Sequence, residues 1–305
     1  MTRSRFTSHT WTLVAALVGA LLISFSAIYY ALSNVSPTTA AFFRAVYALP
    51  VLAVLWWMRR SQDRRPSRRR WLALAAGLSL GADAVAWHTS IDFIGAGLAT
   101  LLANTSVIFV AVGAWILLGE RPRRATLIAI PVILTGVAMV SGIGQGDAFG
   151  ADPLRGTIFA LLAAVLYAGF ILGFRHANDE QAPAAGPLME ATVGTAIAAC
   201  AIGLVGQNID FTVSFPSHGW LLVLALGSQV FGWLLIGYAL PRLPAVETAT
   251  IILIQPALTM VWGALIFDER PSPLQIVGAL VVLAGVTFVA VVRARRGTKP
   301  EPVAV

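Results

Sequence analysis

Ten runs of about twenty apolar residues, separated by short polar segments, constrain the fold of this chain more than any other feature. About 20 apolar residues cross the hydrocarbon core of a bilayer as a helix, because a helix satisfies its backbone hydrogen bonds within the segment. The runs cover 11–32, 39–57, 71–90, 95–118, 125–143, 155–174, 187–205, 219–240, 245–267 and 274–292. The sequence therefore predicts an all-α polytopic membrane protein with ten transmembrane helices.

The composition supports a membrane location. Only 11% of the 305 residues are charged and 58% are hydrophobic, whereas a soluble domain carries about 25% charged residues. The net charge of +7 would suggest nucleic acid in a soluble protein, but the basic residues gather between apolar runs. We expect contact with membrane lipids and no nucleic-acid partner. The single Cys200, without a Cys/His cluster, predicts no disulfide, no metal and no cofactor.

The distribution of Lys and Arg predicts the orientation. If the N-terminus is cytoplasmic and ten spans follow, the inside segments hold 18 of the 21 Lys and Arg residues and the outside segments hold two. Because cytoplasmic loops are enriched in Lys and Arg, we expect both termini in the cytoplasm. Seven arginines lie in the loop 58–70. Orientation alone explains them, and contact with anionic lipid headgroups is the alternative.

Two copies of Glu-Arg-Pro, each at the end of an apolar run, indicate an internal repeat. Aligning 99–122 with 249–271 brings both Ala-Thr pairs and both Gly-Ala pairs into register, and a one-residue gap then superposes the two motifs. Further on, ILTGVAMV at 133–140 matches VLAGVTFV at 282–289. The chain is therefore expected to consist of two five-helix halves.

Five helices per half is an odd number, so the second half should lie upside down relative to the first. Inverted repeats are typical of secondary transporters, in which the solute site forms near the midplane between the halves. The predicted organisation is a first five-helix repeat at 1–143, a periplasmic connecting loop at 144–154, a second, inverted repeat at 155–292 and a cytoplasmic tail at 293–305.

The order of these motifs resembles the EamA-type members of the drug/metabolite transporter superfamily. AAFFRAVYALP at 40–50 carries an Arg like the one near the start of that family's second helix. YALPRLPAVETATIILIQP at 238–256 is similar to the family's hairpin between the eighth and ninth helices. The resemblance covers essentially the whole chain. One departure is Ser106, where the family often has Pro, so it stays open whether the fourth span breaks.

The resemblance implies a transporter, not an enzyme, that carries a small-molecule substrate across the bacterial inner membrane by alternating access. Within the family, the chain is most similar to a bacterial exporter of aromatic amino acids, which implies export of these and related solutes. A broader drug or metabolite exporter, an importer and a non-transporting membrane sensor are the alternatives. Coupling to protons and facilitated diffusion both stay open.

Polar side chains inside a span are costly, which makes them candidates for a solute site. In the third span, Asp83 and Trp87 lie one helical turn apart. An acid beside an indole would suit a solute with an amine and a ring. Gln229 and Trp233 have the same spacing in the eighth span. For each residue, packing or hydrogen bonding between helices is the alternative.

Four further residues complete the candidate substrate-binding set. Gln255 precedes Pro256, where we expect the ninth span to break and to expose backbone groups to a ligand. Asn104 is its counterpart in the first half, and Tyr167 adds an aromatic ring from the sixth span. His88 is a candidate proton carrier, with a structural histidine as the alternative.

The remaining charged residues near the spans are expected to be structural. Arg44, Glu190 and Glu247 should lie near the inner ends of their helices, where snorkelling or interhelical pairing is favoured over solute contact. Glu120 and Glu269 should hydrogen-bond their hairpins or the start of an adjacent helix.

Overall fold

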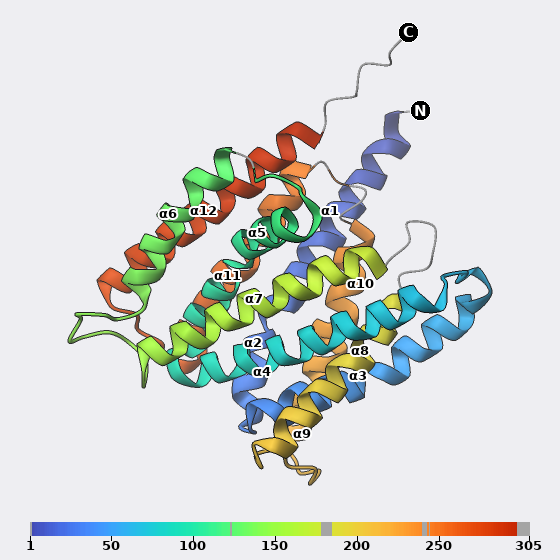
Figure 1. Ribbon diagram of the computed structural model, residues 1–305, viewed down its shortest axis with the longest axis horizontal. Helices are drawn as coiled ribbons and strands as arrows, with labels where there is room; N and C mark the ends of the chain where they lie inside the picture. The colour runs from blue at the N-terminus through green and yellow to red at the C-terminus, as the bar shows by residue number, and fades with distance from the viewer. Residues whose placement is uncertain (1, 123, 178–184, 240–242, 244, 298–305) are drawn as a thin grey trace.

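The computed structural model describes residues 2–122, 124–177, 185–239, 243 and 245–297, and every regular element in these ranges is a helix (Figure 1). Within them, seven segments are long and apolar enough to cross a membrane. Three shorter apolar helices accompany them, at Ser106–Leu118, Arg124–Val140 and Leu253–Phe267. The predicted all-α polytopic membrane fold is therefore confirmed.

The first half contains a run of helices from α1 to α6. They are α1 (Thr2–Ser24), α2 (Ser26–Ser33), α3 (Pro37–Arg59), the short 3-10 helix η1 (Arg60–Gln62), α4 (Ser67–Ala103), α5 (Ser106–Leu118) and α6 (Arg124–Val140). α1 and α2 together form the first span. α2 ends at Asn34, whose φ of 49° lies in the left-handed region. The Ser36 hydroxyl then caps α3 by accepting from the Thr39 N–H at 3.3 Å.

The second half continues from α7 to α12. Its helices are α7 (Pro153–Ala177), α8 (Ala185–Val205), α9 (Ser217–Val223), the π-helix η2 (Leu224–Gly232), α10 (Trp233–Ala239), α11 (Ala245–Phe267) and α12 (Pro273–Gly297). α9, η2 and α10 make one continuous span. α12 continues past the predicted start of the tail at 293, and residues 298–305 lie outside the described part of the chain.

The third and fourth predicted spans meet without a loop. α4 contains the third span and the beginning of the fourth. Its direction changes at Gly95, where φ is 79° and ψ is 167°. Residues with side chains rarely adopt this backbone conformation, so glycine is suited to the kink. The fourth span thus consists of the end of α4 followed by α5.

The fourth span is interrupted and the ninth is continuous, although Pro256 led us to predict a break in the ninth span. α4 ends at Ala103 and α5 starts at Ser106. Between them, the Asn104 amide donates to the Thr100 carbonyl and the Thr105 hydroxyl donates to the Leu102 carbonyl, both at 2.7 Å. Such side-chain bonds compete with the helical pattern.

α11 is continuous through Pro256, so the predicted break there was wrong. Proline removes one backbone donor, but a transmembrane helix tolerates this when neighbouring groups and small local adjustments satisfy the freed carbonyl.

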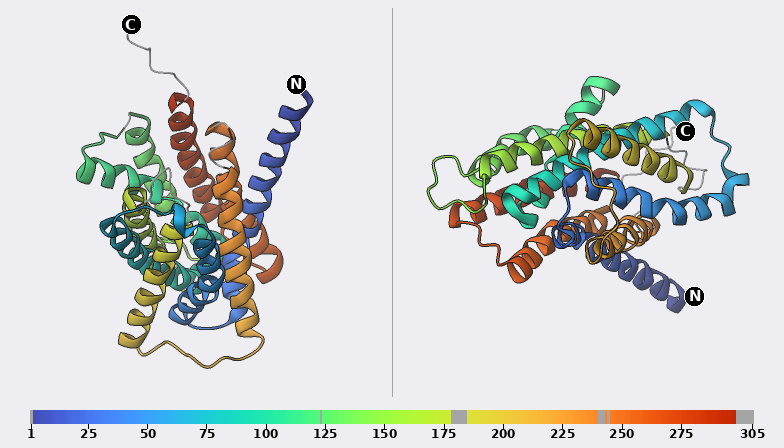
Figure 2. Two further views of the ribbon diagram at one scale, coloured as in Figure 1. Left: turned by 90° about the vertical axis from the view of Figure 1, so that its right-hand side faces the viewer. Right: turned by 90° about the horizontal axis from the view of Figure 1, so that it is seen from below.

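Small residues allow the helices to approach closely. A Cβ on Gly77 or Gly194 would overlap the backbone where α4 meets α8, and one on Gly136 would lie 2.7 Å from the Gly278 carbonyl where α6 meets α12. Close contact through glycine is the usual means of helix association in membranes. The views in Figure 2 show that α1 begins and α12 ends at the same end of the molecule. α4 packs against both α7 and α8.

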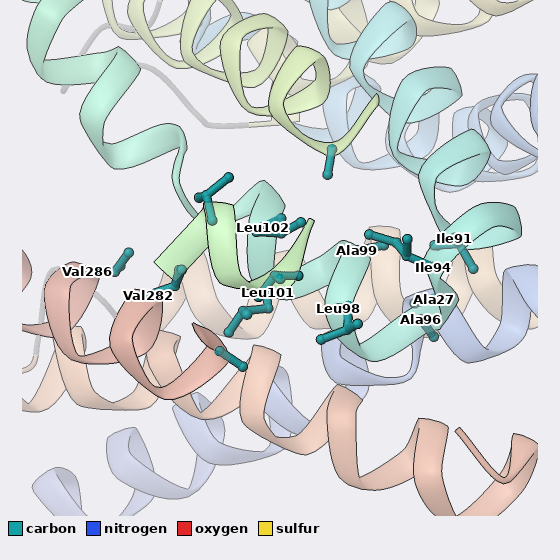
Figure 3. Close-up of a cluster of buried hydrophobic side chains, with 14 of the residues drawn as sticks. Ala27, Ile91, Ile94, Ala96, Leu98, Ala99, Leu101, Leu102, Val282 and Val286 are labelled. Atoms are coloured by element: carbon teal, nitrogen blue, oxygen red, sulfur yellow. The ribbon is translucent and has the colours of Figure 1, made fainter. Parts of the chain in front are cut away.

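A buried apolar cluster lies around the kinked end of α4. Leu98, Leu101 and Leu102 are at most 1% exposed and pack with Val282 and Val286 of α12 (Figure 3). The cluster joins residues of both halves and fixes the part of α4 that follows Gly95.

One arginine of the basic loop 58–70 has a structural role. The buried Arg65 guanidinium donates to Asp63 at 2.9 Å and to Glu190 of α8 at 2.9 and 3.1 Å. The hydrogen bond from the Arg65 side chain to Asp63 is the main reason why the pKa of Asp63 lies below its ordinary value. The backbone N–H of Arg65 and the charges of Arg65 and Arg70 act in the same direction. Glu190 thus pairs mainly with an arginine outside the helices, and the predicted interhelical pairing is its longer contact of 4.0 Å with Arg70 of α4.

Candidate functional site

A cavity of about 270 Å³ lies between the two halves of the chain. Helices α1 to α5 contribute to its wall from the first half, and α7, α8, η2, α10 and α11 contribute from the second. Seven of the eight predicted site residues line it, namely Asp83, Trp87, Asn104, Tyr167, Gln229, Trp233 and Gln255. The fold therefore brings together residues that are up to 172 positions apart in the sequence.

Arg44 also lines this cavity, although the sequence suggested a place near the inner end of its helix. Its Nε donates to Oε1 of Gln229 at 2.9 Å, which is a contact between helices as predicted. The guanidinium carbon lies 5.9 Å from the centre of the Trp87 ring, within range of a cation–π interaction. The arginine in the middle of AAFFRAVYALP could have identified Arg44 as a site residue, because a charged residue within a span usually has a functional role.

The Asp83 carboxylate faces the same cavity from α4. Among the described residues, it receives no hydrogen bond and forms no ion pair within 4.0 Å. Arg44 is the charge that acts on it electrostatically. Opposite charges that are not in direct contact are costly in a membrane interior, and water or a ligand between them would reduce this cost.

Aromatic and apolar side chains form most of the remaining wall. Trp87 and Trp233 come from the two halves, and Tyr167 stands near Phe170 with ring centres 5.8 Å apart. Most ligand pockets combine an apolar lining with a few polar groups that orient the ligand. The cavity is suited to a small solute with a ring or an aliphatic side chain.

Gln255 and Thr259 place two polar groups of α11 on the wall. The Thr259 hydroxyl lies 2.9 Å from two carbonyl oxygens, those of Gln255 and Ser24. Asn104 reaches the wall at the interruption between α4 and α5, beside Thr100. The fourth and ninth spans thus both contribute polar residues to the wall.

His88 is not brought into the cavity. It is fully buried, and its ring stacks on Tyr30 with centroids 4.1 Å apart. Its Nδ1 lies 3.3 Å from the Pro37 carbonyl. The structure places this histidine in a packed contact among α2, α3 and α4.

The two loop glutamates have different partners. Glu269 is buried, and its carboxylate accepts from the N–H of Ala96 at 2.6 Å and from that of Gly97 at 3.1 Å. The predicted contact with a helix start is confirmed for this residue, since the bonds cap the part of α4 that follows the kink. Glu120 is exposed and pairs with Arg175 at 3.2 Å.

A helical membrane protein with a central cavity lined from both halves has the architecture of a membrane transporter. Residues 8–142 and 154–291 each match the model of the EamA-like transporter family. These ranges cover most of the chain, and the chain belongs to this family.

Several curated relatives share about a quarter of their residues with this chain. The threonine/homoserine exporter RhtA of Escherichia coli K12 is 27% identical over 240 residues, which cover 78% of this chain and 77% of the relative. RhtA of Salmonella typhimurium LT2 is 28% identical over 239 residues, with the same shares of 78% and 77%. An uncharacterised protein of Pseudomonas aeruginosa is 28% identical over 249 residues, 82% of each chain.

A solved crystal structure has the same fold. It superposes with a TM-score of 0.60 at 17% sequence identity, over 95% of this chain and 99% of the other. At this identity, the similarity concerns the fold alone. The family and these relatives make the protein a membrane transporter of small molecules.

Proposed function

We propose that the protein is a secondary transporter that exports small amphipathic metabolites, above all aromatic and other hydrophobic amino acids. The observation that carries this proposal is the composition of the cavity. It combines an acid, a base and two indoles, contributed by Asp83, Arg44, Trp87 and Trp233, within about 270 Å³. This volume is near the lower limit of about 300 Å³ for ligand pockets, as a small solute requires.

The proposal includes alternating access between two inverted repeats, with both termini in the cytoplasm and the chain in the bacterial inner membrane. Separate matches of the two halves to one family model support the repeat. The distribution of Lys and Arg supports the orientation. In such an arrangement each half adopts the other's conformation in turn, and the cavity opens alternately to the two sides.

A second candidate is export of short hydroxylated amino acids. The two RhtA relatives named as threonine/homoserine exporters favour it. Thr100, Asn104 and Gln255 would supply hydrogen-bonding groups for a hydroxyl. The two indoles favour the aromatic candidate, because a large aromatic surface is best used against another ring.

Flux from proteoliposomes tests the proposal. Vesicles are loaded with labelled phenylalanine, tryptophan, threonine or lysine, and efflux is followed with and without a pH gradient. We expect fast, saturable efflux of phenylalanine and tryptophan, and a response to the gradient would show proton coupling. Efflux of threonine alone would establish the second candidate. No flux of any of the four would remove the amino-acid assignment.

Gln255 offers a test at one residue. Gln255→Ala should reduce phenylalanine efflux without loss of folded protein, because the amide lines the cavity at the middle of α11. Efflux at the wild-type rate would remove Gln255 from the site.

A further inference from the structure

Arg44 and Asp83 stand in the cavity as two opposite charges without a direct ion pair. Arg44 uses its Nε on Gln229, and among the described residues no protein group accepts from its two terminal nitrogens. These nitrogens form the planar fork that binds carboxylates through two parallel hydrogen bonds. The carboxylate of Asp83 is likewise open to the cavity.

The surroundings orient the Arg44 guanidinium. The Gln229 bond and the Trp87 ring hold the guanidinium in place from two sides. Asp83 and Trp87 lie on one face of α4. A solute between the two charges would meet a cation and an anion at one end, while its side chain would lie against the indoles.

We propose that Arg44 binds the carboxylate of the solute and Asp83 binds its ammonium group, so that the transporter selects zwitterionic α-amino acids. The inference rests on the proposed function and makes it more specific. It assigns the recognition of the amino-acid head group to Arg44 and Asp83, and that of the side chain to the aromatic wall. Gln229 acts as the positioning residue for Arg44.

Three ligands with the same ring separate the two charges. Phenylalanine has both head groups, 2-phenylethylamine lacks the carboxylate, and 3-phenylpropionate lacks the ammonium. Their affinities for the purified protein are measured by calorimetry. We expect wild-type protein to bind each analogue at least about tenfold more weakly than phenylalanine, because each leaves one charge without its partner.

Charge-neutral variants should remove these preferences one at a time. Arg44→Gln should lower the affinity for phenylalanine about tenfold or more and leave that for 2-phenylethylamine unchanged. Asp83→Asn should lower the affinity for phenylalanine and leave that for 3-phenylpropionate unchanged. Arg155→Gln is the matched control, since this arginine is exposed and, in the described part of the chain, its ion pair is with Asp152 at 3.1 Å.

Each outcome decides the assignment. Equal binding of the three ligands to wild-type protein would overturn it while leaving phenylalanine transport in place. An equal loss for all three in Arg44→Gln would show a structural role instead. If that variant does not fold, Arg44→Lys should still bind phenylalanine better than 2-phenylethylamine, and absence of that preference would contradict the proposal. No binding of any ligand to wild-type protein would overturn both this assignment and the proposed amino-acid substrate.

A separate observation concerns the two ends of the molecule. Glu269 immediately precedes α12, whereas Glu120 lines a second cavity together with Val289 and Val292 near the other end of that helix. The 20 residues from Pro273 to Val292 correspond to about 30 Å of helix. The two glutamates of the repeat thus lie at opposite ends of α12.

The surroundings of Glu269 are tight and those of Glu120 are open. A Cβ on Gly95 would lie 2.6 Å from the Glu269 carboxylate, and one on Gly263 would overlap it. Glu120 instead adjoins a cavity of about 250 Å³. In the repeat alignment, the residues that match Ala96 and Gly97 are Val246 and Glu247, in the first turn of α11, which already carries the Glu247 side chain.

We infer that the two glutamates are reciprocal latches: Glu269 holds its end of the transporter closed, and Glu120 caps the start of α11 when the other end closes. The first N–H groups of a helix lack partners within the helix and attract a carboxylate. This inference rests on the proposed alternating access but is measured without flux.

Labelling of one cysteine in the cavity tests the latches. In a Cys200→Ala background, Thr100→Cys is exposed to an impermeant thiol reagent from each face of oriented vesicles. Glu269→Gln should increase labelling from the Glu269 face about tenfold, because one of two charge-assisted bonds is lost and the other weakened. Glu120→Gln should decrease it, since the alternative state is destabilised. Arg155→Gln should leave it unchanged.

Opposite shifts in the two glutamate variants would support the latches. Shifts in the same direction, or no shift in either variant, would overturn the inference. Elution of each variant as a single folded species in detergent is the control, and a variant that fails it is replaced by Glu269→Asp or Glu120→Asp, whose shorter side chains should give smaller shifts of the same sign.

Discussion

The two Glu-Arg-Pro motifs form the same backbone turn at the ends of α5 and α11. The residue before each Glu is left-handed, with φ of 71° at Gly119 and 54° at Asp268. The N–H of each Glu donates at 3.2 Å to the carbonyl six residues earlier, that of Ala114 in one motif and Gly263 in the other. The repeated sequence therefore determines the local turn in both places.

The side chains of the two glutamates differ because their tertiary surroundings differ. Glu269 is buried against the kink of α4 and accepts two backbone N–H groups. Its pKa is raised above the ordinary value by burial, an effect that the hydrogen bonds from Gly97 and Ala96 oppose. Glu120 faces solvent and Arg175. The same motif can thus hold a buried or an exposed carboxylate, depending on what packs against it.

The largest expected effect concerns the membrane face on which each motif lies. With cysteines at Thr212 or Ser61 in the Cys200→Ala background, an impermeant thiol reagent should label Thr212→Cys in intact cells and Ser61→Cys only after permeabilisation. Both positions are exposed, Thr212 in a loop and Ser61 in the short helix η1, and the Lys and Arg distribution predicts that η1 lies inside. The opposite pattern would overturn the orientation and exchange the faces assigned to Glu120 and Glu269.

Removing each carboxylate should affect stability unequally. Glu269→Ala leaves the N–H groups of Ala96 and Gly97 buried without partners, which should destabilise the protein by about 3–5 kcal/mol. Glu120→Ala removes an exposed ion pair, typically worth at most about 1 kcal/mol. Thermal unfolding in detergent measures the loss of stability in both variants. Equal losses would show that the two carboxylates contribute equally to the stability of the protein.

The glycines of the two turns give a finer contrast. Gly95→Ala combines a left-handed backbone, with φ of 79°, with overlap between the new Cβ and Glu269. We expect a loss of about 2–4 kcal/mol, of which about 1–3 is the backbone term, because a φ of 79° with a ψ of 167° is essentially restricted to glycine. Gly119→Ala has a φ of 71° but no atom within 4 Å of the new Cβ, so only the backbone term should remain. If the unfolding temperatures of the two variants fall equally, the tight packing around Glu269 contributes nothing.

How far the sequence predicts this molecule depends on whether a feature is local or tertiary. The apolar runs predicted the spans, because the length and hydropathy of a transmembrane helix depend only on consecutive residues. One-turn spacing put Asp83 and Trp87, and Gln229 and Trp233, on common faces, and each pair lines the cavity. A charge inside an apolar run could have identified Arg44, but the depth of its helix in the bundle is a tertiary property.

Other features depend on contacts that a single sequence does not show. Pro256 suggested a break, yet α11 is continuous, and the interruption lies at Asn104 and Thr105 instead. The kink at Gly95 and its capping by Glu269 join residues 174 positions apart. His88 has a side chain that can carry a proton, but it stacks on Tyr30 outside the cavity.

The smallest expected effect is at the partner of Glu120. Arg175→Gln should change the free energy of unfolding by no more than about 0.5 kcal/mol, because exposed ion pairs contribute little. The pair has side chains that are 56% and 46% exposed. Chemical denaturation in detergent measures this change. A loss of stability above about 2 kcal/mol would mean that the Glu120–Arg175 pair contributes more than an exposed ion pair usually does.

Blocking the cavity tests most directly whether the solute passes between the two halves. Thr100→Cys, in the Cys200→Ala background, is modified with a bulky thiol reagent in proteoliposomes loaded with labelled phenylalanine. If the cavity is the route, modification with a bulky methanethiosulfonate, which forms a mixed disulfide with the cysteine, should reduce efflux at least about tenfold by filling a site of small volume. Dithiothreitol should restore efflux by reducing that disulfide. Unchanged efflux through the fully modified protein would contradict the account.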